Sequence, residues 1–164
     1  MKKLFTVMMA FAAFVLCAEE LAIKGNFPAP RKPGLLPASW NKMSDSKGSF
    51  EIIPTENGNA VMLNADANAK FGIYSPAVAA KAGDKIKISA QVQGEKIALG
   101  IFQYSNPRGT TSQRQIVNVI DGKAEAEFTV ADTKKGKTDK IRVCVYVEKG
   151  QGASVLNIKA FRAE

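Results

Sequence analysis

The stretch Asp84–Ser105, which reads DKIKISAQVQGEKIALGIFQYS, decides the fold because apolar and polar side chains alternate along it. In its first half, Ile86 and Ile88 face one side, whereas the intervening Lys87 faces the other. A period of two is typical of a β-strand that buries one face. We therefore expect two consecutive strands here, each with one side in a hydrophobic core.

The same alternation recurs on both sides of this stretch, and turn residues close each run. Asn57-Gly58 predicts a tight turn, and the spacing across Gly94-Glu95 and Asp121-Gly122 predicts two hairpins. The alternating runs are 49–55, 60–66, 70–76, 84–94, 96–105, 111–120, 123–130, 139–148 and 154–163. Helical periodicity is nearly absent from this part of the chain, and no linker or repeat divides it. These runs predict an all-β fold, a two-sheet antiparallel β-sandwich that forms a single domain over residues 19–164.

The N-terminal segment has the composition of a signal peptide. Two lysines at positions 2–3 precede the apolar run Leu4–Leu16, which is too short to span a bilayer. Cleavage after Ala18 and cleavage after Cys17 both fit the residues that follow the run. A lipoprotein acylated at Cys17 needs a small residue before the cysteine, and Leu16 is not small.

We therefore expect residues 1–18 to be removed as a signal peptide. The exported protein is then periplasmic, or secreted to the cell surface or beyond, with no integral membrane segment in the mature chain. Loss of Lys2 and Lys3 lowers the formal net charge from +8 to +6. Cys144 remains as the single cysteine, which excludes an internal disulfide, and its alternating valine neighbours predict a buried or half-buried thiol.

The composition excludes most catalytic centres. The chain has no histidine, which excludes a histidine base, a Ser-His-Asp triad and most zinc sites. A glycosidase needs two positioned carboxylates, and the acidic residues form no evident pair. Basic residues are not interleaved with aromatic ones, which, together with export, argues against nucleic-acid binding. We expect a protein that is not an enzyme and binds no nucleic acid.

Several short motifs follow one another along the chain. They are IKGNFPAP (23–30), LPASW (36–40), FGIYSP (71–76), AGDKIKISAQVQG (82–94), AEAEFTV (124–130), IRVCVYV (141–147) and SVLNIKAF (154–161). Together they resemble the jelly-roll carbohydrate-binding modules of the cellulose- and xylan-binding type, within the galactose-binding-like fold. The resemblance covers nearly all of the mature chain. It implies a jelly roll that binds a poly- or oligosaccharide on a sheet face or in rim loops.

A proline-rich segment, Lys24–Trp40, precedes most of the predicted strands. Its four prolines fix φ and withhold amide donors, so we expect an irregular crossing that cannot extend a sheet edge. Trp40 has two interpretations. Its ring caps the hydrophobic core, which we favour, or it provides a platform for a sugar.

In the family that the chain resembles, a structural calcium is often held by two acidic residues. One follows the first phenylalanine, and the other is an aspartate in the last strand. Here Pro28 follows Phe27, and Asn157 stands where that aspartate is expected. Calcium prefers several carboxylate or carbonyl oxygens, so both departures put the metal site in doubt. We expect no cofactor.

The alternation of side chains along each strand predicts which residues face a ligand. Phe102 and Tyr104 lie on one side of their strand, and Ala98 and Gly100 lie on the same side, so small residues beside aromatic rings leave room for a shallow groove. The candidate set is Tyr104, Arg142, Tyr146, Phe102, Gln91 and Trp40, with Gln93, Gln113 and either Arg114 or Gln115 as further donors. The alternative for the outward residues is ordinary cross-strand pairing on a solvated face.

The expected function is an exported, noncatalytic domain that binds carbohydrate. The alternative is a structural or adhesive β-sandwich of the cell envelope that keeps the fold, binds a protein partner and has no sugar site. Lysines in the run KKGK (134–137) and at positions 85 and 87 form a solvated face or favour an acidic glycan.

Overall fold

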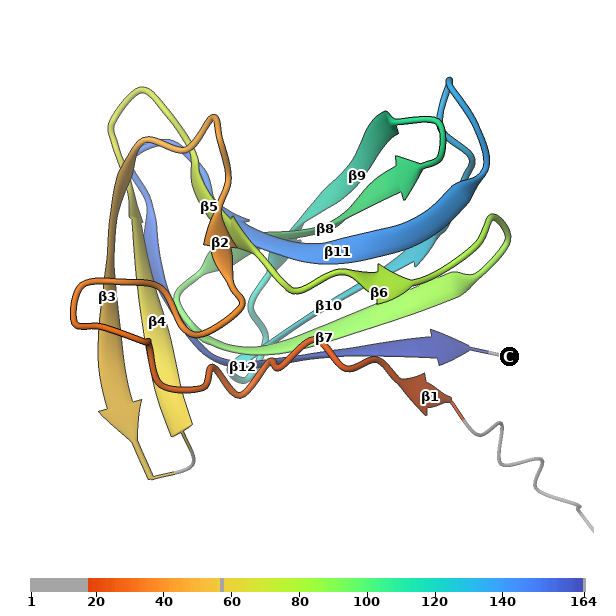
Figure 1. Cartoon of the computed structure of the whole chain (residues 1–164). Coiled ribbons are helices and arrows are strands. Elements are labelled where there is room, and N and C mark those ends of the chain that lie inside the picture. Colours follow the sequence, from red (N-terminus) through yellow and green to blue (C-terminus); the bar gives the residue numbers. More distant parts are fainter. Residues whose placement is uncertain (1–17, 57, 164) are drawn as a thin grey trace, which may run out of the picture.

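The computed structural model describes residues 18–56 and 58–163. The predicted signal peptide, apart from Ala18, lies outside the described residues. In the described part every strand pair is antiparallel, no helix occurs, and the strands form two six-stranded sheets that pack face to face (Figure 1). The predicted two-sheet antiparallel jelly-roll sandwich is confirmed.

The first sheet, called the β7–β12 sheet, has the order β10-β7-β12-β4-β3, with β1 beside β12. Its strands are β1 (Glu19–Glu20), β3 (Gly48–Thr55), β4 (Gly58–Ala65), β7 (Lys85–Gln93), β10 (Lys123–Thr129) and β12 (Gly152–Ala163). The longest pairing joins β7 to β12, from Gln93 opposite Ser154 to Lys85 opposite Ala163.

The second sheet, called the β8–β11 sheet, has the order β2-β5-β11-β8-β9, with β6 beside β11. Its strands are β2 (Asn41–Lys42), β5 (Phe71–Tyr74), β6 (Val78–Ala79), β8 (Lys96–Ser105), β9 (Gly109–Asn118) and β11 (Thr138–Val147). β8 and β9 form a true hairpin, in which Ser105 lies opposite Gly109.

The hydrophobic core lies between the two sheets and is built from alternate residues of each strand. On β7, Ile86 and Ile88 are fully buried, and on β8, Leu99 and Ile101 are fully buried. The core therefore follows the predicted period of two. On β7 the intervening Lys87 is exposed, and on β8 the intervening Gly100 lies on the side opposite the core.

Two of the three predicted turns do not form hairpins. The turn before Gly58 joins β3 to β4 as expected, but β7 and β8 belong to different sheets, as do β9 and β10. Both edges of β7 are taken by β10 and β12, so no edge remains for β8. The chain therefore crosses from one sheet to the other at Gly94-Glu95 and again at Asp121-Gly122.

The two crossings lie side by side and bond each other's backbones. The amide of Val119 donates to the Glu95 carbonyl oxygen at 2.8 Å, and the amide of Val92 donates to the Gly122 carbonyl oxygen at 2.9 Å. These bonds satisfy polar groups that a strand leaving its sheet would otherwise expose without partners.

The proline-rich segment is irregular, as predicted, and it closes one end of the core. Trp40 is 4% exposed, its ring centroid lies 5.0 Å from that of Phe27, and its Nε1 donates to the Lys24 carbonyl oxygen at 3.1 Å. Gly25 is needed beside β12, since a Cβ there would lie 1.5 Å from the carbonyl oxygen of Ile158. The interpretation of Trp40 as a core cap is confirmed.

Candidate functional site

The outer face of the β8–β11 sheet, which points away from the core, brings together most of the nominated side chains. β11 is bowed, and this face lies on the inside of the bow (Figure 1). Arg142 lies opposite Phe102 across the β11–β8 ladder, and Lys140 lies opposite Tyr104. The predicted parity of both strands is therefore confirmed, and the register makes their outward side chains neighbours.

Arg142 is held in place at the centre of this outer face. Its guanidinium carbon lies 4.9 Å from the ring centroid of Tyr74 and 5.9 Å from that of Tyr104. Its Nη1 donates to the carbonyl oxygen of Ser75 at 2.8 Å. Two aromatic rings and one backbone acceptor limit the rotamers of this side chain, so its planar donor edge is preorganised.

Tyr104 extends the aromatic surface toward the β8–β9 turn. Its ring centroid lies 6.5 Å from that of Phe102, and both side chains are half-buried. Burial raises the pKa of the Tyr104 hydroxyl above its ordinary value, although the neighbouring Arg142 opposes the change. The hydroxyl is therefore neutral at physiological pH and can both donate and accept a hydrogen bond.

Tyr146 shares the outer face but is not open to solvent. Its side chain is 3% exposed and packs with Met43, Ala98 and Cys144. A Cβ on Gly100 would lie 3.0 Å from the Tyr146 hydroxyl oxygen. The expectation that small residues leave a shallow groove for ligand is wrong at this end of the face, because the Tyr146 side chain takes that space.

Gly72 on β5 shows the same packing from the other side. A Cβ there would lie 2.6 Å from the Tyr146 Cβ and 2.8 Å from the Met43 sulfur. Burial raises the pKa of the Tyr146 hydroxyl well above its ordinary value, and the nearby Cys144 adds to this effect.

Ion pairs surround Tyr146 on the surface. Lys70 pairs with Asp45 at 2.9 Å, and Arg114 pairs with Glu148 at 3.4 Å. The two cations lie 5.6 Å and 6.0 Å from the centroid of the Tyr146 ring. The Lys70 ammonium, through its hydrogen bond, lowers the pKa of the Asp45 carboxyl. Charge at this end of the face is balanced within the protein.

The opposite end of the face holds a depression of about 490 Å³ beside Tyr104. It is lined by Ala77, Tyr104, Ser105, Asn106, Arg108, Thr110, Asp139, Lys140 and Arg142. Its volume falls in the range of sites that hold small ligands. The open part of the outer face therefore lies around Tyr104 and Arg142.

Two nominated residues lie elsewhere. Gln91 is exposed on the β7–β12 sheet, where it lies opposite Lys123 and Asn157, so it faces away from the other candidates. Trp40 presents no free ring face, because the ring is packed in the core. Neither residue shares a surface with Tyr104.

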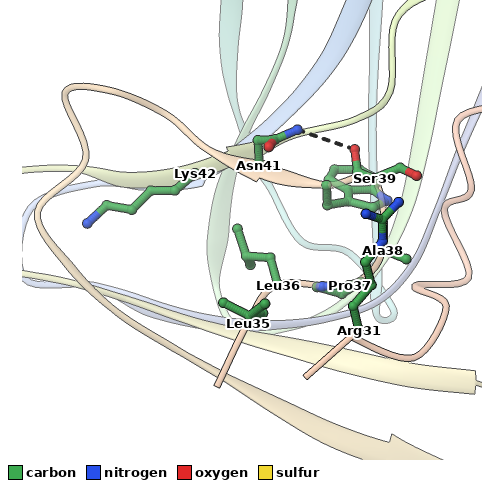
Figure 2. Close-up of a pocket in the computed structure, with 9 residues that line it drawn as sticks. Arg31, Leu35, Leu36, Pro37, Ala38, Ser39, Asn41 and Lys42 are labelled. Atoms are coloured by element: carbon green, nitrogen blue, oxygen red, sulfur yellow. Dashed lines mark hydrogen bonds between the residues drawn. The ribbon is translucent and has the colours of Figure 1, made fainter. Parts of the chain in front are cut away.

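A second depression, of about 440 Å³, lies in the proline-rich segment next to Trp40. Figure 2 shows Arg31, Leu35 and Leu36 around it, and Asn41 Nδ2 donates to the Ser39 carbonyl oxygen at 3.4 Å. Five of its nine lining residues are apolar, and no aromatic side chain among the described residues that line it is open to solvent.

Of the further donors, only Arg114 reaches the outer face of the β8–β11 sheet. Gln113 instead donates to the Thr129 carbonyl oxygen at 2.8 Å, on the side of β9 that meets β10. Tyr74 was not nominated, although the alternation in FGIYSP places it on the opposite side of β5 from the buried Phe71 and Ile73. That parity was the signal that could have found it.

The residues at the implied calcium position do not fit the ion. The Phe27 carbonyl oxygen accepts a hydrogen bond from Asn59 Nδ2 at 2.8 Å. Asn157, on β12 opposite Gln91, offers an amide oxygen where the resemblance implies a carboxylate. Within residues 18–56 and 58–163, no three His, Cys, Asp or Glu side chains are grouped so that they could hold a metal. No helix of the described part is long and apolar enough to cross a membrane.

Comparisons with known proteins support the fold and go no further. No family model matches the chain, and no curated protein matches it. Among solved structures, the chain is similar to the CBM22-1 xylan-binding domain from Paenibacillus barcinonensis Xyn10C, with a TM-score of 0.58 and 10% identity over 90% of this chain and 97% of that one.

Two further structures show the same fold. The family 11 carbohydrate-binding module of the Clostridium thermocellum cellulase Lic26A-Cel5E has a TM-score of 0.52 and 16% identity, over 89% of this chain and 96% of that one. The enzymatically active domain of bacteriophage CBA120 tailspike protein 4 has a TM-score of 0.53 and 8% identity. That match covers 76% of this chain but only 19% of the tailspike chain.

Proposed function

We propose that this protein is an exported, noncatalytic domain that binds a poly- or oligosaccharide on the outer face of the β8–β11 sheet. One observation carries the proposal: Tyr74, Phe102 and Tyr104 lie around Arg142, whose guanidinium is bonded to the Ser75 carbonyl oxygen, beside a depression of about 490 Å³. Aromatic faces stack on the C–H patches of a sugar ring, while the guanidinium and the phenol bond its hydroxyls.

The fold supports the same proposal. Two of the similar structures are named as carbohydrate-binding modules, and the chain spans nearly their whole length. The proposal of export rests on the sequence alone, on the apolar run Leu4–Leu16 that follows two lysines.

The noncatalytic part of the proposal rests on the lining of the depression. Asp139 is its only carboxylate among the described residues, whereas glycosidases use two. The chain also has no histidine that could replace one of them as a general acid or base. We therefore expect the protein to release no reducing sugar from any glycan that it binds.

A glycan array screened with the purified protein, followed by calorimetric titration of the best ligand, tests the proposal. Each hydroxyl exchanges water for protein at a net gain of about 1 kcal/mol, so binding is weak and single rings matter. Tyr104→Ala should lower the affinity by up to about tenfold, which is about 1.4 kcal/mol. Gln91→Ala, on the other sheet, is the control and should leave the affinity unchanged.

If Tyr104→Ala and Gln91→Ala both bind like the parent, the site lies elsewhere on the molecule. If no glycan binds at all, the alternative of a structural or adhesive sandwich with a protein partner replaces this proposal.

A further inference from the structure

The depression beside Tyr104 has an excess of unpaired positive charge. Arg108, Lys140 and Arg142 line it, and Asp139 is the single carboxylate among its described lining residues. None of the three cations forms an ion pair within residues 18–56 and 58–163. This contrasts with the Tyr146 end of the same face, where both cations are paired.

The lysine-rich loop 134–137 adds to the charge at this end. The hydroxyl oxygens of Ser105 and Thr133 lie 2.6 Å apart, so the start of this loop is anchored to the end of β8. A Cβ on Gly109 would lie 2.9 Å from the Lys135 Cβ, which places the loop against the β8–β9 turn. The neighbouring carboxylate of Asp132 accepts a hydrogen bond from the Thr138 amide at 3.0 Å. The fold thus brings Arg108 of the β8–β9 turn, Lys140 and Arg142 of β11, and the lysine-rich loop 134–137 to one end of the β8–β11 sheet.

Arg142 supplies geometry as well as charge. A guanidinium has five N–H donors in a planar fork that matches a carboxylate, and one of these donors is used by the Ser75 carbonyl oxygen. The Tyr74 and Tyr104 rings, whose centroids lie 4.9 Å and 5.9 Å from the guanidinium carbon, limit the orientations of the fork. Such a group recognises a planar anion better than it recognises an uncharged hydroxyl pair.

We propose that this depression binds the carboxylate of a uronic acid unit, so that the preferred ligand is an anionic glycan. The inference rests on the proposed function and adds the class of sugar. Arg142 forms paired hydrogen bonds to the carboxylate, Tyr104 stacks on the ring of the same unit, and Arg108 and Lys140 supply the surrounding positive field.

The test compares oligosaccharides that differ only in charge. Hexamers from galacturonan, mannuronan and glucuronan are titrated calorimetrically beside the same hexamers with their carboxyl groups reduced to alcohols. At least one uronate should bind ten or more times as tightly as its reduced partner in low salt. Raising the salt to several hundred millimolar should bring the ratio of uronate affinity to reduced-sugar affinity close to one, because exposed charges are screened.

Two double variants test whether the cations of this depression cause the preference for the uronate over the reduced sugar. Arg108→Gln combined with Lys140→Gln should lower the ratio of uronate to reduced-sugar affinity by about tenfold. Lys85→Gln combined with Lys123→Gln removes the same charge from the other sheet and should leave the ratio unchanged. Urea unfolding of both double variants checks that each is folded as stably as the parent.

The outcomes separate the two proposals. If the parent binds a neutral glycan of the array but shows no uronate preference, the anionic ligand is wrong and the proposed function stands. If the parent binds no glycan, both are wrong. If the preference survives Arg108→Gln with Lys140→Gln, or is lost in the control, the anion is bound elsewhere and the assignment to this depression is overturned.

Discussion

At the residue scale, Tyr146 shows how packing can remove a binding candidate without moving it. Alternation along β11 correctly places it on the outer face, and the side chains of Met43 and its other neighbours then cover it. Apart from Cys144 on the same strand, these neighbours come from the segment after β2, from β8 and, through Gly72, from β5, all far from Tyr146 in sequence. Strand parity reports which face a side chain takes, but not what lies over it.

Replacing Tyr146 should therefore affect stability more than binding. Tyr146→Ala removes a ring that is 3% exposed and leaves a cavity above Gly72 and Gly100, which should lower the free energy of unfolding by about 3 kcal/mol. Tyr146→Phe keeps the ring and should cost less than about 1.5 kcal/mol. Urea denaturation measures both. A Tyr146→Ala variant as stable as the parent would contradict the packing.

Because of Cys144, the free energy of unfolding should fall as the pH rises above 9. Burial raises the pKa of its thiol from an ordinary value of 9.0 to about 12. The folded state then keeps a proton that the unfolded state loses. The protonated thiol therefore makes its full contribution to the free energy of unfolding below pH 9. This contribution is lost as the pH rises from 9 toward 12, by up to about 1.4 kcal/mol per pH unit.

The measurement is urea unfolding of the parent and of Cys144→Ala between pH 7.5 and about pH 10.5, at matched ionic strength. The parent should lose stability above pH 9 more steeply than the variant, because the variant has no thiol to ionise. Tyrosine ionisation acts on both proteins and cancels in the comparison. Parallel curves for the two proteins would show that the thiol is not buried in solution.

At the scale of the elements, the two crossings between sheets are the feature that sequence reasoning missed. A two-residue link between alternating runs fits a hairpin and a crossing equally well, because alternation within each run is the same in both. What decides is competition for the edges of β7, and those edges are taken by β10 and β12. Both partners follow β7 in the chain, so a local pattern carries no information about them.

The crossing at Gly94 should tolerate little change. Gly94 has a φ of 156°, and a Cβ there would lie 3.0 Å from the Ala153 Cβ of the neighbouring strand. Gly94→Ala should lower the free energy of unfolding by about 2 kcal/mol, from backbone strain together with overpacking.

Gly34 is the matched control for this substitution. It also has a positive φ, of 79°, but nothing lies within 4 Å of a Cβ placed on it. Gly34→Ala should cost only the backbone part, about 1 kcal/mol. Thermal unfolding of both variants checks the order, and an equal loss in the two would mean that the contact with Ala153 has no effect.

At the scale of the whole molecule, the sequence predicted the architecture well and the site in part. Each strand shows its buried face in its own residues, so the sandwich and the outward positions of Tyr104 and Arg142 could be predicted. Which sheet a strand joins depends on long-range pairing. Gln91 and Arg142 both face outward, yet they lie on opposite sides of the molecule.

The molecule should also fold without calcium. At the implied position, Pro28 and Asn157 stand where acidic residues are expected, and the Phe27 carbonyl oxygen already accepts a hydrogen bond from Asn59. A calcium bound at 100 times its Kd would add about 2.7 kcal/mol to the free energy of unfolding. We expect melting temperatures in excess calcium and in EDTA to agree within about 1 °C, since even 1 kcal/mol shifts a domain of this size by about 2–4 °C. A clear rise with calcium would reveal a site that these residues do not explain.

The place of β12 has a consequence for how the chain reaches this structure. The last strand lies between β7 and β4 and also pairs with β1, so it holds together segments from both ends of the chain. Until residues 152–163 leave the ribosome, β7 with β10 and β3 with β4 are two separate ribbons with open edges. Such long-range closure is slow, and the β7–β12 sheet cannot close before residues 152–163 are available to pair.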